Sequence, residues 1–523
     1  MTKDREKSDD RVVPEGRRKA SPTAEVGRGG KAVTDSEQAG QLGLFSETAD
    51  NPQGADGAVE RDRSRSTARA VPKSETEKGP VLPPMTMEEV ASDGNLKRAF
   101  ERVASNKGAP GPDRQTIEEV RKHLPEILQR LHRALLEGTY EPGNIRRVWI
   151  PKPGGGERGL GIPDVVDRIV QQAVYQKLGP HFERTFHASS HGFRPGRSCH
   201  TAIEEACRHL EEGHDWVVDI DLEKFFDRVN HDRLMARLEQ RVADRRILRL
   251  IRRMLEAKVV MPDGVVVSTE EGTPQGGPLS PLLSNIVLDE LDQELEERGH
   301  LFVRYADDCN IYVRSERAGR RAMDSIRRFI ERRLRLKVNE NKSAVARPEE
   351  RHFVGFRLRR RPEDGKVEVE LSKRSKDRID TKVRAMLPRT WGQSVRSSIE
   401  RVNRYLLGWM GFFHICTEEV VRTLQGLDAH IRRRLRAIVL RHWKRRRTIV
   451  KRLIRLGVPP RAAWSGVHKE HRSWWALSHS YAVDRGLNRA YFRCAGLVSL
   501  AEEWSERRPR VVIVPAQLAL ELG

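Results

Sequence analysis

Four aspartates stand in two short segments whose other residues favour β-strands. Asp219 and Asp221 alternate with apolar residues over 216–222, so in a strand both carboxylates lie on one face. Asp307 and Asp308 interrupt the apolar segment 302–313, and residues 301–313 are predicted to form a hairpin with both acids at its turn. Adjacent carboxylates repel each other unless a cation offsets them, and Mg²⁺ and Ca²⁺ prefer oxygen ligands. These residue types therefore indicate a site for divalent metal ions.

The two segments together have the donors that two-metal phosphoryl transfer requires. In that chemistry one metal ion activates a hydroxyl group and the other holds a triphosphate. Taken alone, residues 216–222 could instead be an edge strand with solvated acids, and residues 302–313 could contain a solvated turn. The alternation of side chains along a strand does not decide whether Asp219 or Asp221 is the metal ligand. The five cysteines are scattered without zinc spacing, which argues against structural zinc and favours a reducing compartment.

Charge and length set the broader class of protein. The 523 residues include 97 Lys and Arg against 75 Asp and Glu, a net charge of +22 that favours a nucleic-acid partner. Such a length predicts several domains. No segment approaches the roughly 20 apolar residues of a membrane span, and no signal peptide is evident, so we expect a soluble intracellular protein.

The chain divides by composition into four parts. Residues 1–85 are polar and charged and predict a disordered arm. Residues 86–361 mix helical and strand patterns, 362–508 are dominated by Arg-rich helices, and 509–523 form a short tail. The expected elements are helices over 124–136 and 165–178, strands over 145–151 and 216–222, a turn at 153–156, and a helix capped by Asn230 or Asp232.

Seven blocks in order resemble the reverse transcriptases with maturase activity that bacterial group II introns encode. The central block is Tyr305-Ala306-Asp307-Asp308, and the others are 150–163, 191–198, 221–227, 272–281, 336–343 and 353–356. The resemblance runs from about 86 to 505. It implies an α+β fold, namely a polymerase right hand of fingers and palm with an antiparallel sheet, followed by an α-helical thumb or maturase domain.

The resemblance also implies roles for individual residues. Asp221, Asp307 and Asp308 would be the catalytic metal ligands. Asp221 is chosen over Asp219 because the family places this aspartate five residues before an aromatic residue, here Phe226. The Leu222 carbonyl would be a further ligand. Phe226 would exclude the 2′-hydroxyl of a ribonucleotide, although it could equally be a core residue. The remaining expected nucleotide contacts are Lys152 and Arg158 around a glycine-rich turn, Gln275 before two glycines, and Lys342 near the primer end.

The C-terminal third resembles the thumb or maturase domain of the intron family, notably at 403–413 and 474–500. Ile431, Leu435, Ile438 and Val439 share one face of a predicted helix. A run of cationic residues usually forms a solvated face of a helix. In this run nearly all charges are positive and Trp443 lies among them, which favours contact with RNA. The expected RNA-binding residues are Arg432, Arg433, Arg434, Arg436, Lys444, Arg445 and Arg446.

The implied activity is RNA-directed DNA synthesis with two Mg²⁺ ions, for which Mn²⁺ could substitute. Implied partners are the parent intron RNA, whose splicing and mobility the protein would assist, an RNA template with a DNA primer, dNTPs and a DNA target. The site of action would be the bacterial cytoplasm, at the nucleoid when DNA is the target. No His-Asn-His or paired-Cys motif follows Leu500, so we expect no endonuclease. The alternatives are a free-standing host reverse transcriptase and a splicing-only RNA-binding maturase.

An apolar island in the polar arm suggests a further partner. Gln41, Leu42, Leu44 and Phe45 resemble the short peptide with which bacterial replication proteins bind the sliding clamp. A clamp contact would suit a protein that uses a nascent strand as its primer.

Overall fold

The computed structural model describes residues 84–151, 156–388, 392–469 and 473–507. The island around Leu44, the loop residue Lys152 and the expected turn at 153–156, apart from Gly156, lie outside the described residues. So do residues 1–83 of the expected arm and the whole of the expected tail.

Five helices near the start of the described chain share one apolar core: α2 (Met87–Ala91), α3 (Asp93–Ser105), α4 (Ile117–Lys122), α5 (Leu124–Glu137) and α6 (Val165–Glu183). In α5, Ile127, Leu131 and Leu135 recur every four residues and are buried. The helix ends at Gly138, whose φ of 71° is the left-handed conformation that glycine adopts readily. Both helices expected in this region are confirmed.

A four-stranded sheet has the strand order β2-β1-β4-β5, and β1 and β2 lie between α5 and α6 in the chain. Its strands are β1 (Ile145–Pro151), β2 (Glu157–Ile162), β4 (Val259–Val260) and β5 (Val266–Val267). The β1 bounds agree with the expected strand, and β1 pairs antiparallel with β2 from Arg146 opposite Ile162 to Pro151 opposite Glu157. This hairpin forms the fingers part of the fold, and its β2 strand carries Arg158.

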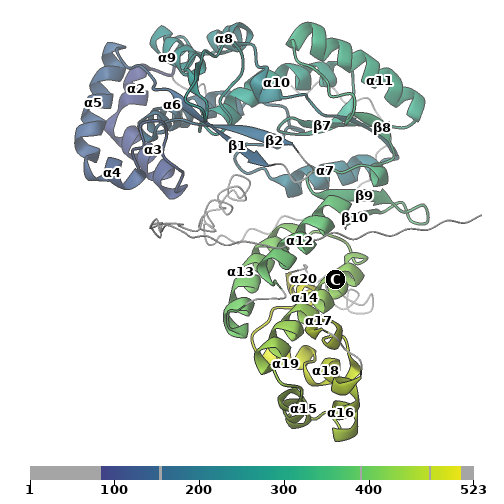
Figure 1. Cartoon of the computed structure of the whole chain (residues 1–523). Helices are drawn as coiled ribbons and strands as arrows, with labels where there is room; N and C mark the ends of the chain where they lie inside the picture. The colour runs from purple at the N-terminus through teal and green to yellow at the C-terminus, as the bar shows by residue number, and fades with distance from the viewer. Residues whose placement is uncertain (1–83, 152–155, 389–391, 470–472, 508–523) are drawn as a thin grey trace, which may run out of the picture. The chain divides into compact units, whose positions relative to one another are not determined.

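The palm is a second four-stranded sheet, ordered β6-β7-β3-β8. It consists of β3 (Trp216–Ile220), β6 (Leu301–Tyr305), β7 (Asp308–Val313) and β8 (Ala344–Ala346). Val218 and Ile311 point into a core shared with α10 (Ser280–Glu297) and α11 (Glu316–Phe329), whereas Val217 and Val303 face α7 (Cys199–Glu211). Helices therefore cover both faces of the sheet, with α10 and α11 on one side and α7 on the other (Figure 1).

Short elements complete this region: α8 (His231–Glu239), α9 (Arg245–Leu255), the 3₁₀ turns η1 (Phe225–Asp227) and η3 (Pro348–Glu350), and the π-helical turn η2 (Ile330–Leu334). Asn230, not Asp232, caps α8, because its side chain accepts a hydrogen bond from the Arg233 amide. The expected strand over 216–222 stops at Ile220, so Asp221 and Leu222 lie just beyond it.

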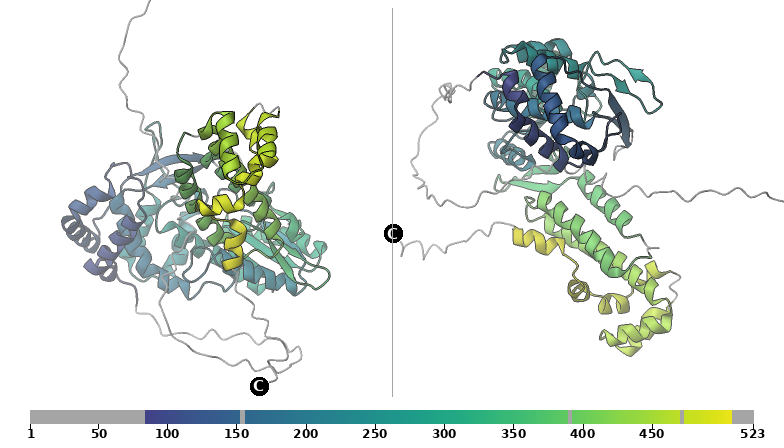
Figure 2. Two further views of the ribbon diagram at one scale, coloured as in Figure 1. Left: turned by 90° about the horizontal axis from the view of Figure 1, so that it is seen from below. Right: turned by 90° about the vertical axis from the view of Figure 1, so that its left-hand side faces the viewer.

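A hairpin of β9 (Phe356–Arg360) and β10 (Val367–Leu371) leads into the C-terminal helices. The expected boundary between 361 and 362 falls within this hairpin, because the pairing of two strands joins residues on both sides of it. Figure 2 gives two further views of the helices that follow, which are α12 (Lys373–Met386), α13 (Val395–Phe413), α14 (Val420–Trp443), α15 (Arg446–Arg455), α16 (Pro460–His468), α17 (Trp474–Leu477), α18 (Tyr481–Gly486), α19 (Arg489–Cys494) and α20 (Leu500–Arg507). None of the described helices is long and apolar enough to cross a membrane.

Candidate active site

The turn between β6 and β7 carries two of the expected acids. Tyr305 pairs with Asp308 across the hairpin, so Ala306 and Asp307 form a two-residue turn. Ala306 has a φ of 56°, which is unusual for a residue with a Cβ atom and needs support from its surroundings. Asp307 is half-buried and Asp308 is exposed. The hairpin expected over 301–313 is confirmed, with both acids at its tip.

Asp221 lies beside this turn because β3 pairs with β7, with Ile220 opposite Cys309. Two contacts from the 336–343 block fix its backbone: its amide donates to Ser343 Oγ at 3.0 Å, and its carbonyl accepts from the Asn339 amide at 2.8 Å. Leu222 continues this pairing through a bridge to Val338. Two sequence blocks more than 100 residues apart thus position one carboxylate.

The partners of Asp219 and Asp221 separate the roles of these two acids. The Asp219 carboxylate accepts two hydrogen bonds from Arg351, at 2.8 Å from Nε and 2.6 Å from Nη2. Asp221 instead faces the Lys342 ammonium, whose Nζ lies 3.2 Å from each carboxylate oxygen. Both donors of Arg351 therefore meet one oxygen of Asp219, Oδ2, in a charged pair, whereas Asp221 is paired with an ammonium.

The electrostatics place the three candidate acids together. Burial, together with the negative charge of Asp221, raises the pKa of Asp307, while Arg158 and Lys342 oppose the shift. The protein packed around the turn and the charges of Asp307, Asp219 and Asp221 raise the pKa of Asp308. The Asp308 side chain is itself exposed, and water weakens the repulsion that it experiences. Carboxylates that disfavour one another's charge in this way would gain from a shared cation.

The donor chemistry of the site suits a hard divalent cation. The three carboxylates supply oxygen ligands, and Lys342 and Arg158 already provide positive charge at their edge. Within residues 84–151, 156–388, 392–469 and 473–507, however, no three His, Cys, Asp or Glu side chains are gathered closely enough to hold a metal ion. The residues thus fit divalent metal ions by ligand type and charge, without a closed coordination sphere.

The structure brings some of the expected nucleotide contacts to this site. Arg158 on β2 is exposed and stabilises the charged form of Asp307. Phe226 in η1 is half-buried. Its ring packs edge-on against that of Phe225, with 5.2 Å between the ring centroids, and its backbone carbonyl accepts a hydrogen bond from the Thr273 amide. Phe226 and the 272–281 block are therefore neighbours in the fold.

The two glycines after Gln275 have a packing role. A Cβ atom on Gly276 would lie 2.5 Å from the Gly161 carbonyl oxygen, and one on Gly277 would lie 2.3 Å from Gln171 Oε1. The Gln275 carbonyl accepts a hydrogen bond from the Gly161 amide at 2.7 Å. The glycines thus allow this loop to lie against β2 and α6, and Gln275 is held at the junction of fingers and palm.

Two arginines that the sequence patterns did not single out contact the segments that carry the acids. Arg351 pairs with Asp219 and also donates to the Lys342 carbonyl, which joins two segments behind Asp221. Arg304 on β6 is fully buried and contacts the turn that carries Asp307. The sequence does hold a signal for Arg304, since a charged residue within the apolar segment 302–313 requires partners when the segment is buried.

The expected RNA-binding set needs a correction at two positions. Arg434 and Arg436 on α14 are buried. Arg434 donates to the carbonyls of Leu387 and Arg384, and Arg436 donates to the Leu487 carbonyl. Both guanidinium groups point inward, where they donate hydrogen bonds to carbonyl oxygens at the ends of neighbouring segments. These two residues therefore hold the helices together and do not form an RNA-facing surface.

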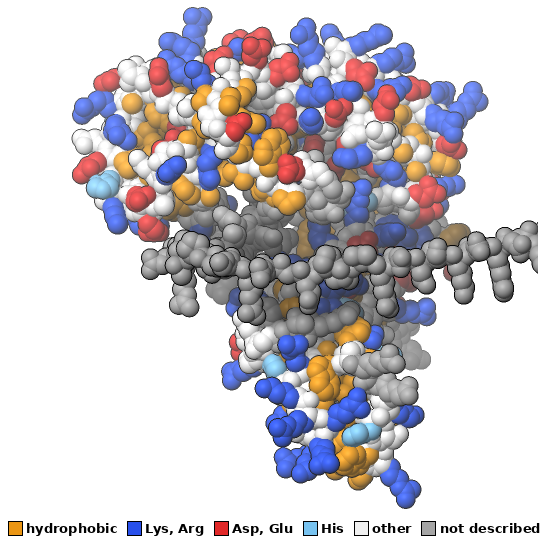
Figure 3. Space-filling model, viewed as in Figure 1, with side chains coloured by type: hydrophobic (Ala, Val, Ile, Leu, Met, Phe, Trp, Pro, Cys, Tyr) orange, Lys and Arg blue, Asp and Glu red, His pale blue; other side chains and the backbone are white. Residues whose placement is uncertain are grey.

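The other cations of the set remain at or near the surface. Lys444, Arg445 and Arg446 are exposed where α14 ends and α15 begins, and Arg432 is half-buried. Arg433 lies with its guanidinium carbon 4.1 Å from the centroid of the Trp475 ring. Figure 3 shows Lys and Arg side chains gathered over the region of α15 and α16. The apolar face expected from Ile431, Leu435, Ile438 and Val439 is confirmed as core.

This palm, with its acidic turn and its basic helical extension, defines a nucleic-acid polymerase, and two family models narrow the class. Residues 150–358 match "Reverse transcriptase (RNA-dependent DNA polymerase)", and residues 376–454 match "Group II intron, maturase-specific domain". Protein YkfC of Escherichia coli (strain K12) is 34% identical over 316 residues, which are 52% of this chain and 83% of that protein. The chain belongs to the reverse transcriptases with maturase domains that group II introns encode.

Other similarities are more limited in extent. Group II intron-encoded protein LtrA of Lactococcus lactis subsp. cremoris is 36% identical over 197 residues, or 37% of this chain and 32% of that protein. The matched region thus spans most of YkfC but only about a third of LtrA. Among solved structures, a chain of the "Partial Cas6-RT-Cas1--Cas2 complex" is 24% identical, with a TM-score of 0.32, over 47% of this chain and 42% of that chain.

Proposed function

We propose that this protein synthesises DNA on an RNA template at Asp221, Asp307 and Asp308. The observation that carries the proposal is the convergence of these carboxylates at the end of β3 and the β6–β7 turn, beside the cations of Arg158 and Lys342. A reaction that joins a primer hydroxyl to a triphosphate requires clustered negative ligands for metal ions and positive groups for the phosphates. Asp221, Asp307 and Asp308 supply the first kind of group, and Arg158 and Lys342 supply the second.

Divalent metal dependence is general in this family, and we propose Mg²⁺ as the physiological ion, with Mn²⁺ as a substitute. Asp221, Asp307 and Asp308 would hold two such ions, with the Leu222 carbonyl as a further ligand. When bound, Mg²⁺ supplies activation of the primer 3′-hydroxyl and neutralises charge on the triphosphate.

The chain's own side chains would bind and select the nucleotide. Arg158 is exposed beside Asp307, where its guanidinium can pair with phosphate oxygens, and Lys152 on the preceding loop would add a second cation. Phe226 would lie against the sugar and exclude a 2′-hydroxyl by contact, which favours dNTPs over rNTPs. Gln275 would support the base pair from the loop that packs on β2.

The C-terminal helices would bind the parent intron RNA. Five of the seven cations expected to contact RNA remain candidates: Arg432, Arg433, Lys444, Arg445 and Arg446. By stabilising folded RNA, this surface would assist splicing, and the polymerase would then copy the intron into its DNA target at the nucleoid. Phosphate contacts of this kind make affinity fall steeply with salt.

Extension of a DNA primer on an RNA template with dNTPs and Mg²⁺ tests the proposal. Asp307→Ala with Asp308→Ala is expected to abolish incorporation while RNA binding persists. A matched double variant, Asp324→Ala with Asp377→Ala, removes two exposed aspartates from α11 and α12 and should retain incorporation. A folded wild type that binds intron RNA but never extends the primer would contradict the polymerase and favour the splicing-only maturase.

We also propose that Gln41, Leu42, Leu44 and Phe45 bind the bacterial sliding clamp. The proposal rests on the sequence alone, since these residues lie outside the described chain. Purified clamp should capture the wild type and fail to capture the Leu44→Ala, Phe45→Ala variant. Equal capture of both proteins would refute it.

A further inference from the structure

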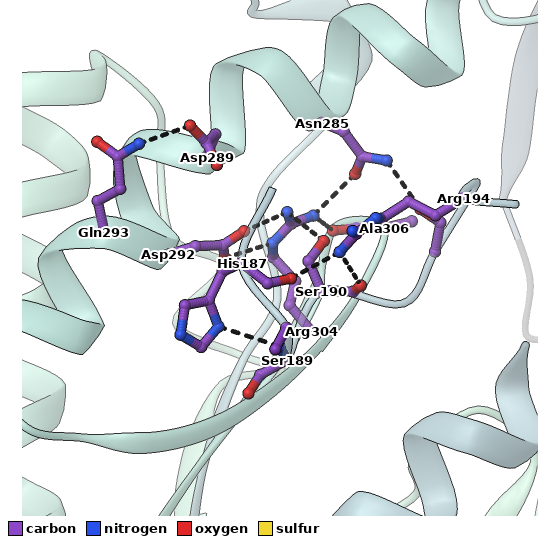
Figure 4. A network of polar contacts seen from close by, with 12 residues as sticks. His187, Ser189, Ser190, Arg194, Asn285, Asp289, Asp292, Gln293, Arg304 and Ala306 are labelled. Atoms are coloured by element: carbon purple, nitrogen blue, oxygen red, sulfur yellow. Dashed lines mark hydrogen bonds and ion pairs between the residues drawn. The ribbon is translucent and has the colours of Figure 1, made fainter. Parts of the chain in front are cut away.

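Arg304 forms the centre of a buried polar network directly behind the acidic turn. Its side chain and that of Asp292 on α10 are both fully buried. Nε lies 2.7 Å from Asp292 Oδ1 and Nη2 lies 2.5 Å from Asp292 Oδ2, so the pair is bidentate. Figure 4 shows the guanidinium enclosed by Asp292, Asn285, Ser190 and Ala306.

The remaining N–H groups of Arg304 are also satisfied. Nη1 donates to Asn285 Oδ1 at 3.0 Å and to the Ala306 carbonyl at 2.9 Å, and Nη2 donates to Ser190 Oγ at 2.7 Å. All five guanidinium hydrogens therefore have acceptors. A buried charge is costly unless every group is paired in this way, and replacing such a pair with apolar side chains is often neutral or stabilising. Stability alone therefore gives weak reason for an arginine here.

The network is directed at the turn that carries Asp307. The Ala306 carbonyl, which accepts from Arg304, belongs to the residue with the left-handed φ of 56°. On the other side of the turn, a Cβ atom on Gly192 would lie 2.2 Å from the Ala306 amide nitrogen. Asn285 joins the two supports, because its Nδ2 donates to the Gly192 carbonyl at 2.8 Å while its Oδ1 accepts from Arg304.

The backbone of Arg304 ties the same segment to the sheet edge. Its amide donates to the Ser189 carbonyl at 2.9 Å, and its carbonyl accepts from the His191 amide at 2.8 Å. Residues 189–192 thus extend the sheet beside β6 and bring Gly192 against the turn. An unusual backbone conformation persists only where surrounding contacts fix it, and these contacts surround Ala306.

We infer that Arg304 is a positioning residue: with Asp292, Asn285 and Gly192 it fixes the Ala306–Asp307 turn and thereby sets the affinity of the Asp307 carboxylate for divalent metal ions. The inference rests on the proposed function of that carboxylate. Metal sites lose affinity by 10- to 100-fold when residues that orient their ligands are changed, and we expect a loss of about tenfold or more here.

Mn²⁺ titration followed by electron paramagnetic resonance, with primer–template bound, measures this affinity without relying on catalysis. Arg304→Lys retains the charge but loses the planar fork, so we expect weaker Mn²⁺ binding and a higher Mg²⁺ concentration for half-maximal extension. Arg304→Met with Asp292→Leu removes both buried charges, which should preserve folding while leaving the Ala306 carbonyl unsupported. Gly192→Ala leaves Arg304 intact but displaces the turn, and it should give the same phenotype.

Asn95→Ala is the matched control for general destabilisation. Asn95 is buried among the helices α2, α3 and α6, where Nδ2 donates to the carbonyls of Val90 and Ala173. This variant should lower Tm with Mn²⁺ affinity unchanged. The inference is overturned if the Arg304 and Gly192 variants bind Mn²⁺ like the wild type, or if Mn²⁺ affinity falls equally in Asn95→Ala. A wild type that binds Mn²⁺ through Asp307 but does not extend primers would refute the polymerase and leave the inference intact.

Discussion

Lys342 Nζ lies 3.2 Å from both carboxylate oxygens of Asp221, whereas Asp219, two residues earlier, is held by the guanidinium of Arg351. Arg351 also donates to the Lys342 carbonyl, so the two ion pairs share one support. A flexible ammonium can move away from a carboxylate when a metal ion or a phosphate arrives, whereas a guanidinium that donates two hydrogen bonds is held more firmly. The two aspartates should therefore respond differently to the same substitution.

Asp221→Asn should lower the rate of primer extension by at least about 100-fold, because it removes charge from the proposed metal site. Asp219→Asn should retain most of the rate, because Asp219 is paired with Arg351 and is not a proposed metal ligand. Extension assays on both variants measure the difference. Equal loss of extension would contradict the assignment of Asp221 rather than Asp219.

Phe226→Ala should increase the use of rNTPs relative to dNTPs by about tenfold, since a cavity beside the sugar would admit the 2′-hydroxyl. The ratio of kcat/KM values for a matched dNTP and rNTP measures this selectivity. Phe225→Leu is the control, because Phe225 is buried beside Phe226 and changes packing without opening that surface. If both variants lose extension with unchanged selectivity, Phe226 is a core residue.

Local patterns predicted the elements of the site better than its side-chain partners. Alternation and turn chemistry identified the hairpin over 301–313 and the bounds of β1, and they narrowed the cap of α8 to two residues, because each depends on neighbouring residues. The cation that pairs with Asp219 is Arg351, which is 132 residues away in the chain. No periodicity contains that information.

The arginines of α14 illustrate the same limit. Spacing correctly placed Leu435 in the core, yet it could not show that Arg434 and Arg436 turn inward to the carbonyls of Leu387 and Leu487. A guanidinium is buried when distant backbone acceptors meet it, which is a property of tertiary structure. The charge pattern predicted a basic surface, and the fold decided which cations belong to it.

Asp289→Asn should stabilise the protein above pH 6. Burial and the neighbouring charge of Asp292 raise the pKa of Asp289 from 3.8 to about 6. The folded state therefore holds this proton between about pH 4 and 6 after the unfolded chain has released it, so stability falls as pH rises through that range. Asparagine cannot ionise and avoids this loss, which we expect to amount to about 1–3 kcal/mol at pH 8.

Urea denaturation of wild type and Asp289→Asn at pH 5 and pH 8, without divalent ions, measures this effect. The gain should be larger at pH 8 than at pH 5. Asp377→Asn, at an exposed position on α12, serves as the control and should show no such difference. A gain that is equal at both pH values would mean that the substitution acts through packing and not through charge.

The cations expected to bind RNA should separate into two groups, the buried arginines of α14 and the exposed residues between α14 and α15. Lys444→Ala with Arg445→Ala should weaken binding of the parent intron RNA and leave Tm unchanged. The slope of log affinity against log salt should fall by about 0.7–0.9 for each phosphate that the protein no longer neutralises.

Arg434→Ala should have the opposite effects. It should lower Tm, because it leaves the carbonyls of Leu387 and Arg384 without their donor, and it should leave the salt slope unchanged. Arg317→Ala with Arg321→Ala removes the same charge from exposed positions on α11 and controls for net charge. Filter binding over a range of salt concentrations measures each slope, and a reduced slope for Arg434→Ala would return that residue to the RNA-binding surface.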